Sequence, residues 1–382
     1  MIVFYAISLL EKFRKKMRMK KTKEKKTIVL ASGGTGGHMF PTAVLANELI
    51  KKYNVVLITD DRGSKITQNF NDKVKIYVVR AKSFKKGIIS KIGTFINIGF
   101  GILFAFKILL KEKPKIMVSF GGYASFPSAF GAVILRIPII LHEQNALLGK
   151  TNRFILPFAK KLAISFKDTH RISKFFKKKV IFTGAPVTKE IEKNYKKRYP
   201  NNKKLHILIT GGSLGANIFG KVLPKAIKLL TLKERQQISI VQQVVEKDIE
   251  QVKTAYKSMK VEAEVSSFFN DMPERLAKAN LVISRSGAMT INEIMISGKP
   301  AIMVPLPISA EDHQTLNARV LADNGAGWIM QQDMFTKEML ASRLKSILAN
   351  KTLLKTAGLR SKELATLNAG KNLVELVEQE IK

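Results

Sequence analysis

The residues of this chain best suited to chemistry form a glycine cluster that ends in a histidine, at positions 32–38 with the sequence SGGTGGH. A short β-branched run at 27–31 precedes the cluster, and residues with helical spacing follow it, with Pro41 near the first turn. This order predicts a strand, a tight turn and a helix. Glycines allow a ligand to approach the backbone N–H groups, and the positive end of the helix points to the same place. We therefore expect an anionic group, or an oxygen that gains negative charge, to bind there.

The cluster does not match the common nucleotide-binding motifs. A dinucleotide fingerprint that starts at Gly34 would need a glycine where Met39 stands, and no lysine follows the glycines as it does in a phosphate-binding loop. Asp60 or Asp61, after the apolar run at 55–59, does imitate the acid that binds a cofactor ribose. A Rossmann-type oxidoreductase therefore stays an alternative, as does a tight turn without a ligand.

A second group of candidate residues lies in the C-terminal half. The apolar run at 281–284 leads into RSGAMT at 285–290, which is predicted to open a helix that carries Glu293. A helix that starts with small residues presents free N–H groups to a diphosphate, and Arg285 adds positive charge nearby. Glu293, two turns into the helix, would accept a hydrogen bond from a ribose hydroxyl. The alternative for Glu293 is an ordinary exposed helix glutamate.

Short strands that alternate with helices must position these residues. Such alternation is typical of a parallel sheet with helices on both faces, in which ligands bind at the carboxyl ends of the strands. The pattern stops at Gly184 and the lysine-rich stretch up to Lys204, which we interpret as a linker, and then restarts. The predicted strands are 27–31, 55–59, 74–79, 115–119, 138–141, 161–165 and 180–183 before the linker, and 205–210, 238–242, 261–265, 281–284, 301–304 and 328–330 after it. The other motifs that follow strands are FGGYAS at 120–125, HEQN at 142–145, GGSLGAN at 211–217 and EDHQ at 311–314.

Length and composition limit the class of protein. With 382 residues, 46% of them apolar, the chain exceeds what one core usually holds, so we expect two α/β domains. The absence of cysteine excludes disulfides and thiolate metal sites, and the five histidines form no metal-binding pattern. A net charge of +37 predicts attraction to nucleic acid, anionic lipid or phosphorylated small molecules, although lysines spread over the whole chain are also typical of a lysine-biased genome. No groove-entering helix or aromatic stacking motif supports a nucleic-acid binder.

The first 26 residues differ from the rest of the chain. They begin with an apolar run and then become strongly basic, which is the wrong order for a secretory signal. We predict a disordered basic extension. The alternatives are an amphipathic segment on a membrane, or a translation start at Met17 or Met19.

One long apolar segment, at 88–110, must be compared in length with a membrane-spanning helix. Its longest part without charge, 92–106, has 15 residues. That part would be roughly 22 Å long as a helix, against the ~30 Å of a bilayer core. We therefore predict a crossover helix of the sheet. The preceding stretch, 84–91, mixes apolar side chains with lysines, as a surface that contacts an anionic membrane does.

Six of these motifs, in this order, resemble the MurG group of glycosyltransferase family 28, which transfers N-acetylglucosamine in peptidoglycan synthesis. The resemblance covers nearly everything from Thr27 onward and implies a GT-B fold, in which two Rossmann-like, doubly wound parallel-sheet domains face across a cleft. It implies an acceptor and membrane-facing domain at 27–186, a donor-binding domain at 187–367, and a final helix at 368–382 that packs back on the first. The implied reaction moves N-acetylglucosamine from UDP-N-acetylglucosamine to the 4-hydroxyl of lipid I (undecaprenyl-pyrophosphoryl-MurNAc-pentapeptide), with inversion, and forms lipid II. Its motifs are GGTGGH at 33–38, GGY at 121–123, HEQN at 142–145, GGSLGA at 211–216, RSGAMT at 285–290 with Glu293, and DHQ at 312–314.

An inverting transfer needs a base for the acceptor hydroxyl and stabilisation of the leaving diphosphate. His38 is the first candidate base, because imidazole titrates near working pH, and Glu143 is the second. The alternative for His38 is a non-catalytic role, in shaping the turn or in binding the acceptor diphosphate. Helix N-termini and Arg285 would stabilise the leaving group. We place the acceptor side at Gly121, Gly122 and Tyr123. The donor contacts that the resemblance implies are Thr35, Gly36, Gly37, Asn145, Ser213, Phe269 beside the uracil, Ala288, Met289, Thr290, Glu293 and Gln314.

The resemblance also predicts what the protein needs and where it works. No Asp-x-Asp motif stands in a suitable place, so we expect no obligatory metal and no cofactor. We expect peripheral attachment to an anionic membrane at the cytoplasmic face of the cell (inner) membrane. In one departure from the family, Thr188 follows Ala185-Pro186-Val187 where the family usually has arginine. A donor contact of the family is therefore in question here, and the oligomeric state and the acceptor peptide stay open.

Overall fold

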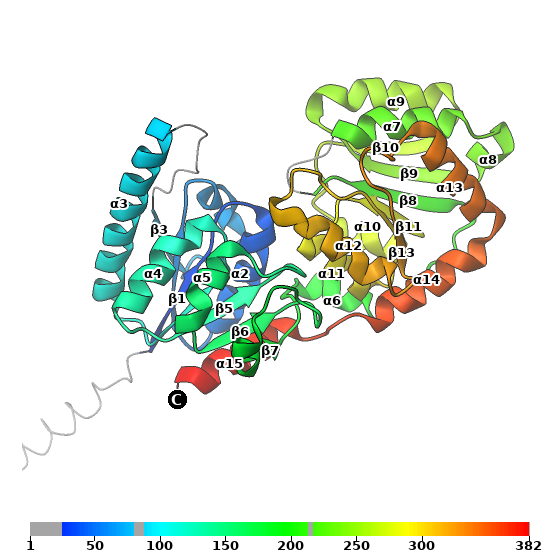
Figure 1. The fold of residues 1–382 in the computed structure, drawn as a ribbon. Helices are drawn as coiled ribbons and strands as arrows, with labels where there is room; N and C mark the ends of the chain where they lie inside the picture. Colours follow the sequence, from blue (N-terminus) through cyan, green and yellow to red (C-terminus); the bar gives the residue numbers. More distant parts are fainter. Residues whose placement is uncertain (1–24, 80–87, 213–216, 382) are drawn as a thin grey trace, which may run out of the picture.

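The computed structural model in Figure 1 describes residues 25–79, 88–212 and 217–381, and gives only the backbone for 88–98. The predicted N-terminal extension up to residue 24, the lysine-containing turn at 84–87 and the candidate Ser213 lie outside the described residues.

The first sheet has seven parallel strands in the order β3-β2-β1-β4-β5-β6-β7. Its central strands are continuous apolar runs, because helices cover both faces of the sheet. The sheet thus confirms the parallel arrangement predicted from the alternation of elements. The strands are β1 (Thr27–Ala31), β2 (Asn54–Thr59), β3 (Lys75–Val78), β4 (Ile116–Ser119), β5 (Ile139–Glu143), β6 (Lys161–Ile164) and β7 (Val180–Phe182).

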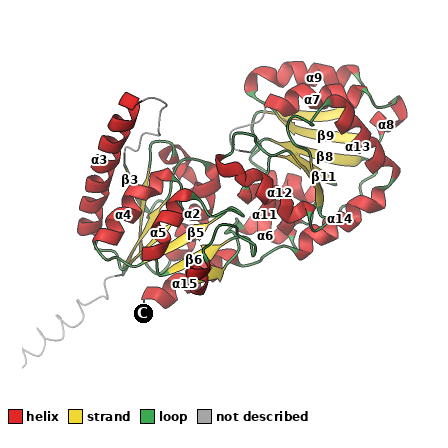
Figure 2. Cartoon of the chain, viewed as in Figure 1, coloured by secondary structure: helices red, strands yellow, loops and turns green. Residues whose placement is uncertain are grey.

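One helix of this half, α3 (Ile88–Glu112), is the crossover between β3 and β4, as predicted. Its buried residues Ile108 and Leu109 join the apolar cluster under α4, and α3 and α4 lie side by side in Figures 1 and 2. Within the part of the chain that the structure describes, no helix is long and apolar enough to cross a membrane. The other helices are α2 (Gly36–Leu49), η1 (Gly63–Asn69), η2 (Tyr123–Ser125), α4 (Phe126–Ile134), α5 (Lys150–Ile155), η3 (Leu156–Phe158) and η4 (Lys174–Lys179).

The second sheet repeats the design with six parallel strands in the order β10-β9-β8-β11-β12-β13. Its strands are β8 (Leu205–Thr210), β9 (Ile238–Gln243), β10 (Glu262–Ser266), β11 (Leu281–Ser284), β12 (Ala301–Met303) and β13 (Gly327–Ile329). The helices around it are α7 (Asn217–Lys228), α8 (Leu232–Gln236), η5 (Glu246–Asp248), α9 (Ile249–Ser258), α10 (Met272–Lys278), α11 (Ala288–Ser297), η6 (Ala310–Asp312), α12 (His313–Ala322), α13 (Lys337–Ala349) and α14 (Lys351–Glu363).

The segment predicted as a linker is not a free connection. It contains helix α6 (Lys189–Asn194), which packs against α10 and α11. Ala185, Val187 and Ile191 are buried in the same apolar cluster as α11. The many lysines of this stretch hid the few apolar residues that fix it to the second sheet.

The last helix, α15 (Ala369–Ile381), returns to the first sheet. Its apolar side, with Leu373, Leu376 and Val377, is buried against α2 and β4. Lys52 Nζ also lies 2.9 Å from Glu378 Oε1 on this helix. The amphipathic pattern of the C-terminus therefore corresponds to a helix that joins the first half of the molecule, and Figure 1 shows it beneath β6 and β7.

Both sheets change winding direction at one place, between β1 and β4 in the first and between β8 and β11 in the second. Ligands of open parallel sheets bind outside the carboxyl ends of the strands at such a switch point. The motifs GGTGGH, GGY and RSGAMT follow β1, β4 and β11 at these edges. Several strand ends differ from the prediction by one residue, and the end of β5 differs by two: β5 continues through His142 and Glu143, so these two residues belong to the strand and the loop starts at Gln144.

Candidate active site

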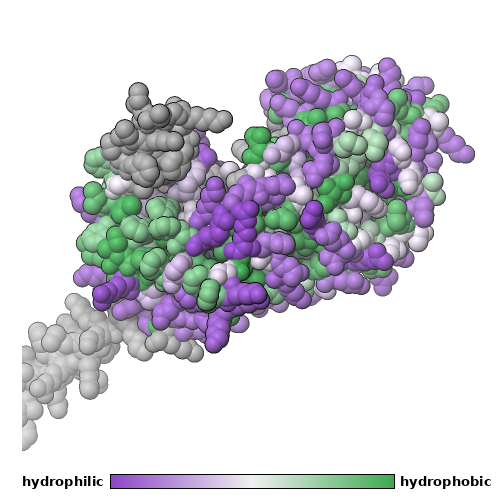
Figure 3. Space-filling model, viewed as in Figure 1, coloured by the Kyte–Doolittle hydropathy of each residue, from purple (hydrophilic) through white to green (hydrophobic). Residues whose placement is uncertain are grey.

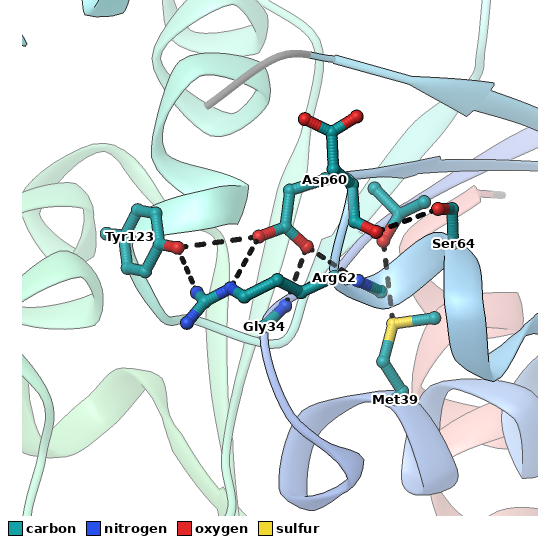
Figure 4. A network of polar contacts seen from close by, with 9 residues as sticks. Gly34, Met39, Asp60, Arg62, Ser64 and Tyr123 are labelled. Carbon is teal, nitrogen blue, oxygen red and sulfur yellow. Dashed lines mark hydrogen bonds and ion pairs between the residues drawn. The ribbon is translucent and has the colours of Figure 1, made fainter. Parts of the chain in front are cut away.

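The glycine turn between β1 and α2 is built around Asp60. One carboxylate oxygen, Oδ1, accepts hydrogen bonds from the N–H groups of Gly34 (2.8 Å) and Gly63 (2.9 Å), and Arg62 Nε lies 3.3 Å from Oδ2. Asp60 is 2% exposed, and Figure 4 shows it at the centre of this network. The acid that imitates a cofactor-binding aspartate therefore shapes the turn from inside. This geometry speaks against the oxidoreductase alternative.

Two features of the turn require glycine. A Cβ on Gly33 would lie 2.6 Å from both Asp60 Oδ1 and Ala124 Cβ, and Gly34 has a φ of +86°. Thr35 then takes the N-cap position of α2, but its side chain caps no N–H group of the helix. The first-turn N–H groups of a helix lack partners within the helix, so those of Gly36 and Gly37 are suited to bind an anion.

His38 is the third residue of α2, and hydrogen bonds at Nδ1 hold its ring. Nδ1 lies 2.9 Å from the Phe120 carbonyl oxygen and 2.9 Å from Gln144 Oε1. Because a carbonyl oxygen can only accept, Nδ1 carries the proton and donates it. Nε2 is then the basic nitrogen, and it faces Gly122, on which a Cβ would lie 3.3 Å away. The arrangement leaves His38 able to accept a proton at Nε2.

The predicted acceptor-side motif lies directly beside this ring. Gly121 and Gly122 both have a φ of +74°, and a Cβ on Gly121 would lie 2.8 Å from Asn152 Nδ2. Tyr123 follows, with its hydroxyl 3.5 Å from Asp60 Oδ2 and in contact with the Arg62 guanidinium. Burial raises the pKa of the Tyr123 hydroxyl. The structure thus brings this motif and His38 together, although they are more than 80 residues apart.

Glu143, the second candidate base, is engaged in four hydrogen bonds. Its Oε1 accepts from the N–H and the side-chain amide of Asn145, both at 3.1 Å. Its Oε2 accepts from the Gly149 N–H and from Asn152 Nδ2, both at 2.9 Å. A carboxylate with four donors and 2% exposure is suited to hold a loop and poorly suited to receive a substrate proton. The geometry therefore favours His38 over Glu143 as the base.

The second edge contains Glu293, on the second turn of α11. The helix starts after Gly287, which occupies the N-cap position without a side-chain cap, and Ala288 and Met289 are nearly buried. Glu293 is partly exposed, and the described residues provide no hydrogen bond or ion pair to its carboxyl group. Burial raises the pKa of Glu293 to about 7. A partly enclosed carboxyl group without a partner among the described residues is suited to accept a hydrogen bond from a ribose hydroxyl, and its partial burial differs from the ordinary exposed glutamate of the alternative.

Arg285, which is predicted to stabilise the leaving group, is held by hydrogen bonds within the protein. Its Nη1 donates to the carbonyl oxygens of Val304 and Pro305, both at 3.0 Å, and its Nη2 donates to Gln332 Oε1 at 2.6 Å. The guanidinium also lies 5.6 Å from the centre of the Phe219 ring. These contacts fasten the end of β12 to the neighbouring loop. The charge of Arg285 lies at the predicted edge of the sheet, but its terminal N–H groups serve the protein.

Three further predicted donor contacts, Phe269, Gln314 and Thr290, belong to the second domain. Phe269 is 7% exposed and lies under the Arg275 guanidinium, 4.0 Å from the ring centre, whereas its neighbour Phe268 is 63% exposed. Gln314, in the first turn of α12, accepts a hydrogen bond from the Leu306 N–H at 3.0 Å. Thr290 is partly exposed next to the start of α11, and Thr188 is exposed at the N-cap of α6.

One residue of the site was missed by the sequence reasoning. Asn317, on α12 and fully buried, connects the two edges. Its Oδ1 accepts from the Ala146 N–H at 2.8 Å, and its Nδ2 donates to Asn145 Oδ1 at 3.1 Å and to the Ser286 carbonyl oxygen at 3.0 Å. The available signal was a polar residue on the otherwise apolar side of a helix that starts at DHQ. The bond to Asn145 brings that candidate donor contact next to the start of α11.

A second contact between the edges involves charges. Glu311 and Asp312 both adopt left-handed backbone conformations, with φ of 53° and 56°, so α12 starts only at His313. Arg153 Nη2 lies 2.6 Å from Glu311 Oε2, and Arg171 contacts Oε1 of the same carboxylate. Both arginines lower the pKa of Glu311. Among the described residues, no group of three or more histidine and acidic side chains is arranged to hold a metal ion.

Comparison with known proteins agrees with this geometry. The model of the glycosyltransferase family 28 N-terminal domain matches residues 28–164, and that of the C-terminal domain matches residues 206–373. The chain is 38% identical over 355 residues to the UDP-N-acetylglucosamine--N-acetylmuramyl-(pentapeptide) pyrophosphoryl-undecaprenol N-acetylglucosamine transferase of Rhodospirillum centenum, covering 92% of this chain and 93% of that protein. It is 40% identical over 337 residues to the protein of the same name from Rickettsia canadensis, covering 87% and 93%.

A solved structure gives the same result for the fold. The crystal structure of Acinetobacter baumannii MurG superimposes with a TM-score of 0.77 at 29% identity, over 93% of this chain and 99% of that one. Two Rossmann-like parallel sheets with their carboxyl edges together constitute the GT-B fold, as predicted. On the strength of both domain matches and of these relatives, the chain belongs to glycosyltransferase family 28.

Proposed function

We propose that this enzyme transfers N-acetylglucosamine from UDP-N-acetylglucosamine to the 4-hydroxyl of the N-acetylmuramyl group of lipid I, with inversion, and so forms lipid II. The match with this chain covers 93% of each of the two relatives named above, and both are named for that activity. The observation that supports the chemistry most directly is His38, with Nδ1–H bound to two oxygens and Nε2 available.

The proposed reaction is a single displacement. His38 Nε2 removes the proton from the acceptor 4-hydroxyl as that oxygen attacks the anomeric carbon of the donor sugar. The bond from the anomeric carbon to the diphosphate oxygen breaks on the opposite face, which inverts the configuration. The developing charge of UDP falls on backbone N–H groups at the starts of α2 and α11. We expect no obligatory metal, and activity that is lost in chelator and restored by magnesium would contradict this expectation.

We assign the donor to the second domain and the acceptor to the first. Glu293 accepts a hydrogen bond from a ribose hydroxyl of the donor, with Thr290, Gln314 and the start of α11 around it. The N–H groups of Gly36 and Gly37, from the first domain, bind diphosphate oxygens of the donor. We also propose domain limits of 27–186 and 187–367, with the final helix belonging to the first domain. The burial of α15 against α2 and β4 supports this last assignment.

The decisive test is incubation of the purified protein with UDP-N-acetylglucosamine and a short-chain lipid I analogue. We expect release of UDP together with a product heavier by one N-acetylhexosamine, and release of UDP only when both substrates are present. A UDP-hexose lacking the acetamido group that works equally well would leave the donor specificity unsupported. Salt-sensitive oligonucleotide binding without sugar transfer would favour the nucleic-acid alternative.

We further propose that the first domain attaches peripherally to the cytoplasmic face of the cell membrane. Apolar side chains gather on the part of this domain that carries α3 and α4 (Figure 3). Phe154 packs on two rings of α4, and Lys179 of η4 donates to three carbonyl groups at 156–159, so α4, α5, η3 and η4 lie together. Helix η4 also carries four lysines. The exposed apolar residues of α3, α4, α5, η3 and η4 include Phe100, Leu103, Phe104, Leu110, Ile134, Phe154, Phe158 and Phe175.

Vesicle sedimentation tests this attachment. At low salt the protein should pellet with phosphatidylglycerol vesicles and far less with phosphatidylcholine vesicles, because apolar contact and lysine charge act together. The double substitution F158S and F175S should reduce the pelleted fraction severalfold. Substitution of Leu359, an exposed apolar residue of the second domain, to serine is the matched control. Equal pelleting of both variants would remove this surface from the proposal.

A further inference from the structure

A chain of hydrogen bonds connects His38 to a second, buried histidine through Gln144. Gln144 Oε1 lies 2.9 Å from His38 Nδ1, and Gln144 Nε2 lies 2.9 Å from His142 Nδ1. At the far end, His142 Nε2 lies 3.3 Å from the Gly184 carbonyl oxygen. At the near end, His38 Nδ1 also meets the Phe120 carbonyl oxygen. Every polar atom of the three side chains except His38 Nε2 therefore has a partner.

The two carbonyl groups determine the position of each proton in the chain. Because Phe120 O only accepts, His38 Nδ1 is a donor, and the Gln144 atom that faces it must be the oxygen. The Gln144 nitrogen then faces His142 Nδ1, which must accept. The remaining proton of His142 is on Nε2, where the Gly184 carbonyl group receives it. One assignment satisfies all four bonds, and reversal of the Gln144 amide would break two of them.

Burial keeps this arrangement neutral. His142 is fully buried and Gln144 is 1% exposed. Desolvation lowers the pKa of His142 to about 4, and the Phe120 ring covers it with the ring centres 5.1 Å apart. A proton added to His142 Nδ1 would also point at the Gln144 N–H group, so two donors would face each other without an acceptor. His142 therefore holds the amide in place and does not compete with His38 for the substrate proton.

We propose that Gln144 is a positioning residue of the transfer reaction: together with the Phe120 carbonyl oxygen, its amide oxygen holds the Nδ1–H form of His38, and it stabilises the imidazolium that forms when Nε2 takes the acceptor proton. His142 acts one step further away, since it fixes the orientation of the Gln144 amide. The role resembles that of the aspartate in a hydrolase triad, but a neutral amide replaces the carboxylate. The inference rests on the proposed role of His38 as base.

The test combines kinetics with a spectroscopic readout of the histidine protons. Gln144→Leu removes both bonds and keeps most of the side-chain volume. We expect kcat to fall about ten- to a hundredfold, the loss typical of a hydrogen bond to a group that becomes charged, with less than about threefold change in the KM for UDP-N-acetylglucosamine. Gln242→Leu is the matched control, because Gln242 is equally buried, on β9, and bonds to Tyr256. Its kcat should stay within about twofold of the wild type, which separates a general cost of burying leucine from the proposed role.

Long-range ¹H–¹⁵N spectra of protein labelled at its five histidines give the second readout. In the wild type at neutral pH, we expect the proton of His38 on Nδ1 and that of His142 on Nε2, with signals assigned by single histidine substitutions. Gln144→Leu should leave the proton of His142 on Nε2, where the Gly184 carbonyl oxygen still accepts it, and should shift the signal of the His38 Nδ1–H proton, which loses one of its two acceptors. A wild-type His38 that carries its proton on Nε2 would overturn the proposal, as would unchanged kcat and spectra in Gln144→Leu.

These outcomes separate the inference from the proposed function. The tautomers are measured without substrate, so they hold or fail whatever reaction the enzyme performs. Full turnover in His38→Ala would remove the base and thus the catalytic part of this inference. Loss of turnover in His38→Ala together with normal turnover in Gln144→Leu would remove the role of Gln144 alone.

Discussion

The two strand–turn–helix units β1–α2 and β11–α11 occupy the same position in their sheets, but they treat polar groups in opposite ways. Around α2, the side chains of His38, Asp60 and Glu143 are all hydrogen-bonded within the protein. At α11, the described residues offer the Glu293 carboxyl group no partner. A base must be oriented before the substrate arrives, whereas a binding group can receive its partner from the ligand. The difference supports our proposal that the first edge performs the chemistry and the second binds the donor.

The strongest test of this contrast is His38→Ala. We expect kcat to fall about 10²- to 10⁴-fold, the usual contribution of a general base, while the dissociation constant of UDP-N-acetylglucosamine stays nearly unchanged. Steady-state kinetics and calorimetric titration with the donor measure the two quantities. His170→Ala, at an exposed histidine of the same domain, is the control and should behave as wild type. Near-normal turnover in His38→Ala would assign the chemistry elsewhere.

Glu293 should make the affinity for the donor depend on pH. A ribose hydroxyl bonds best to the ionised carboxylate, and burial raises the pKa of Glu293 to about 7. Affinity for UDP-N-acetylglucosamine should therefore weaken about tenfold from pH 8 to pH 6, as protonation removes the acceptor. Glu293→Gln should bind more weakly at pH 8 and show no such pH dependence. A wild-type affinity that is flat over this range would show that Glu293 does not contact the donor.

The same substitution has an opposite effect on stability. A carboxyl group whose pKa is raised in the folded state contributes stability below its unfolded pKa, and this contribution is lost as pH rises through about 7. Glu293→Gln should therefore gain melting temperature relative to the wild type at pH 8 and lose that advantage at pH 5. Thermal unfolding at the two pH values measures the difference. An equal gain at both values would contradict the role of ionisation.

Asn317 tests whether the two edges need to be held together. Asn317→Ala leaves the Ala146 N–H group and Asn145 Oδ1 without their partner, which should cost about 1–3 kcal/mol of unfolding free energy. We expect kcat/KM for the donor to fall about tenfold, because Asn145 and the start of α11 lose their common anchor. Asn324→Ala, whose side chain bonds only to the exposed end of the same helix, is the control. If both variants lose the same activity, the bridge has no specific role.

The smallest effect is expected from the ion pairs of Glu311. Because Glu311 and its two arginines are partly exposed, Glu311→Gln should change the donor KM by no more than about fivefold. The difference should disappear near 0.5 M salt, since screening weakens such pairs. Glu338→Gln, at an exposed pair with Lys337, serves as the control. A salt-independent effect would mean that the strained turn at Glu311, and not its charge, governs donor binding.

Much of the fold followed from local pattern. Short β-branched runs identified the strands of both sheets because strands buried on both faces admit few polar residues, and the glycine turns followed because few other residues fit them. The errors arose where distant residues decide. The strand β5 extends through His142 and Glu143 since a buried network satisfies these polar side chains, and α6 forms within a lysine-rich stretch because three apolar residues reach the core of the second domain.

The sequence by itself determined two parallel sheets, their glycine turns and the residue types at the carboxyl ends of the strands, because these depend on periodicity and on backbone freedom. Only the tertiary structure decided which polar groups bond within the protein and which have no partner among the described residues. Asp60, Glu143 and Arg285 carry charges that sequence reasoning directs toward a ligand, but groups of the protein itself bond to them, among them the Gly34 N–H, the Asn152 amide and the Val304 carbonyl group. Asn317 and Gln144 gain their roles from hydrogen bonds to residues far along the chain. Such bonds are directional and depend on positions that no local pattern specifies.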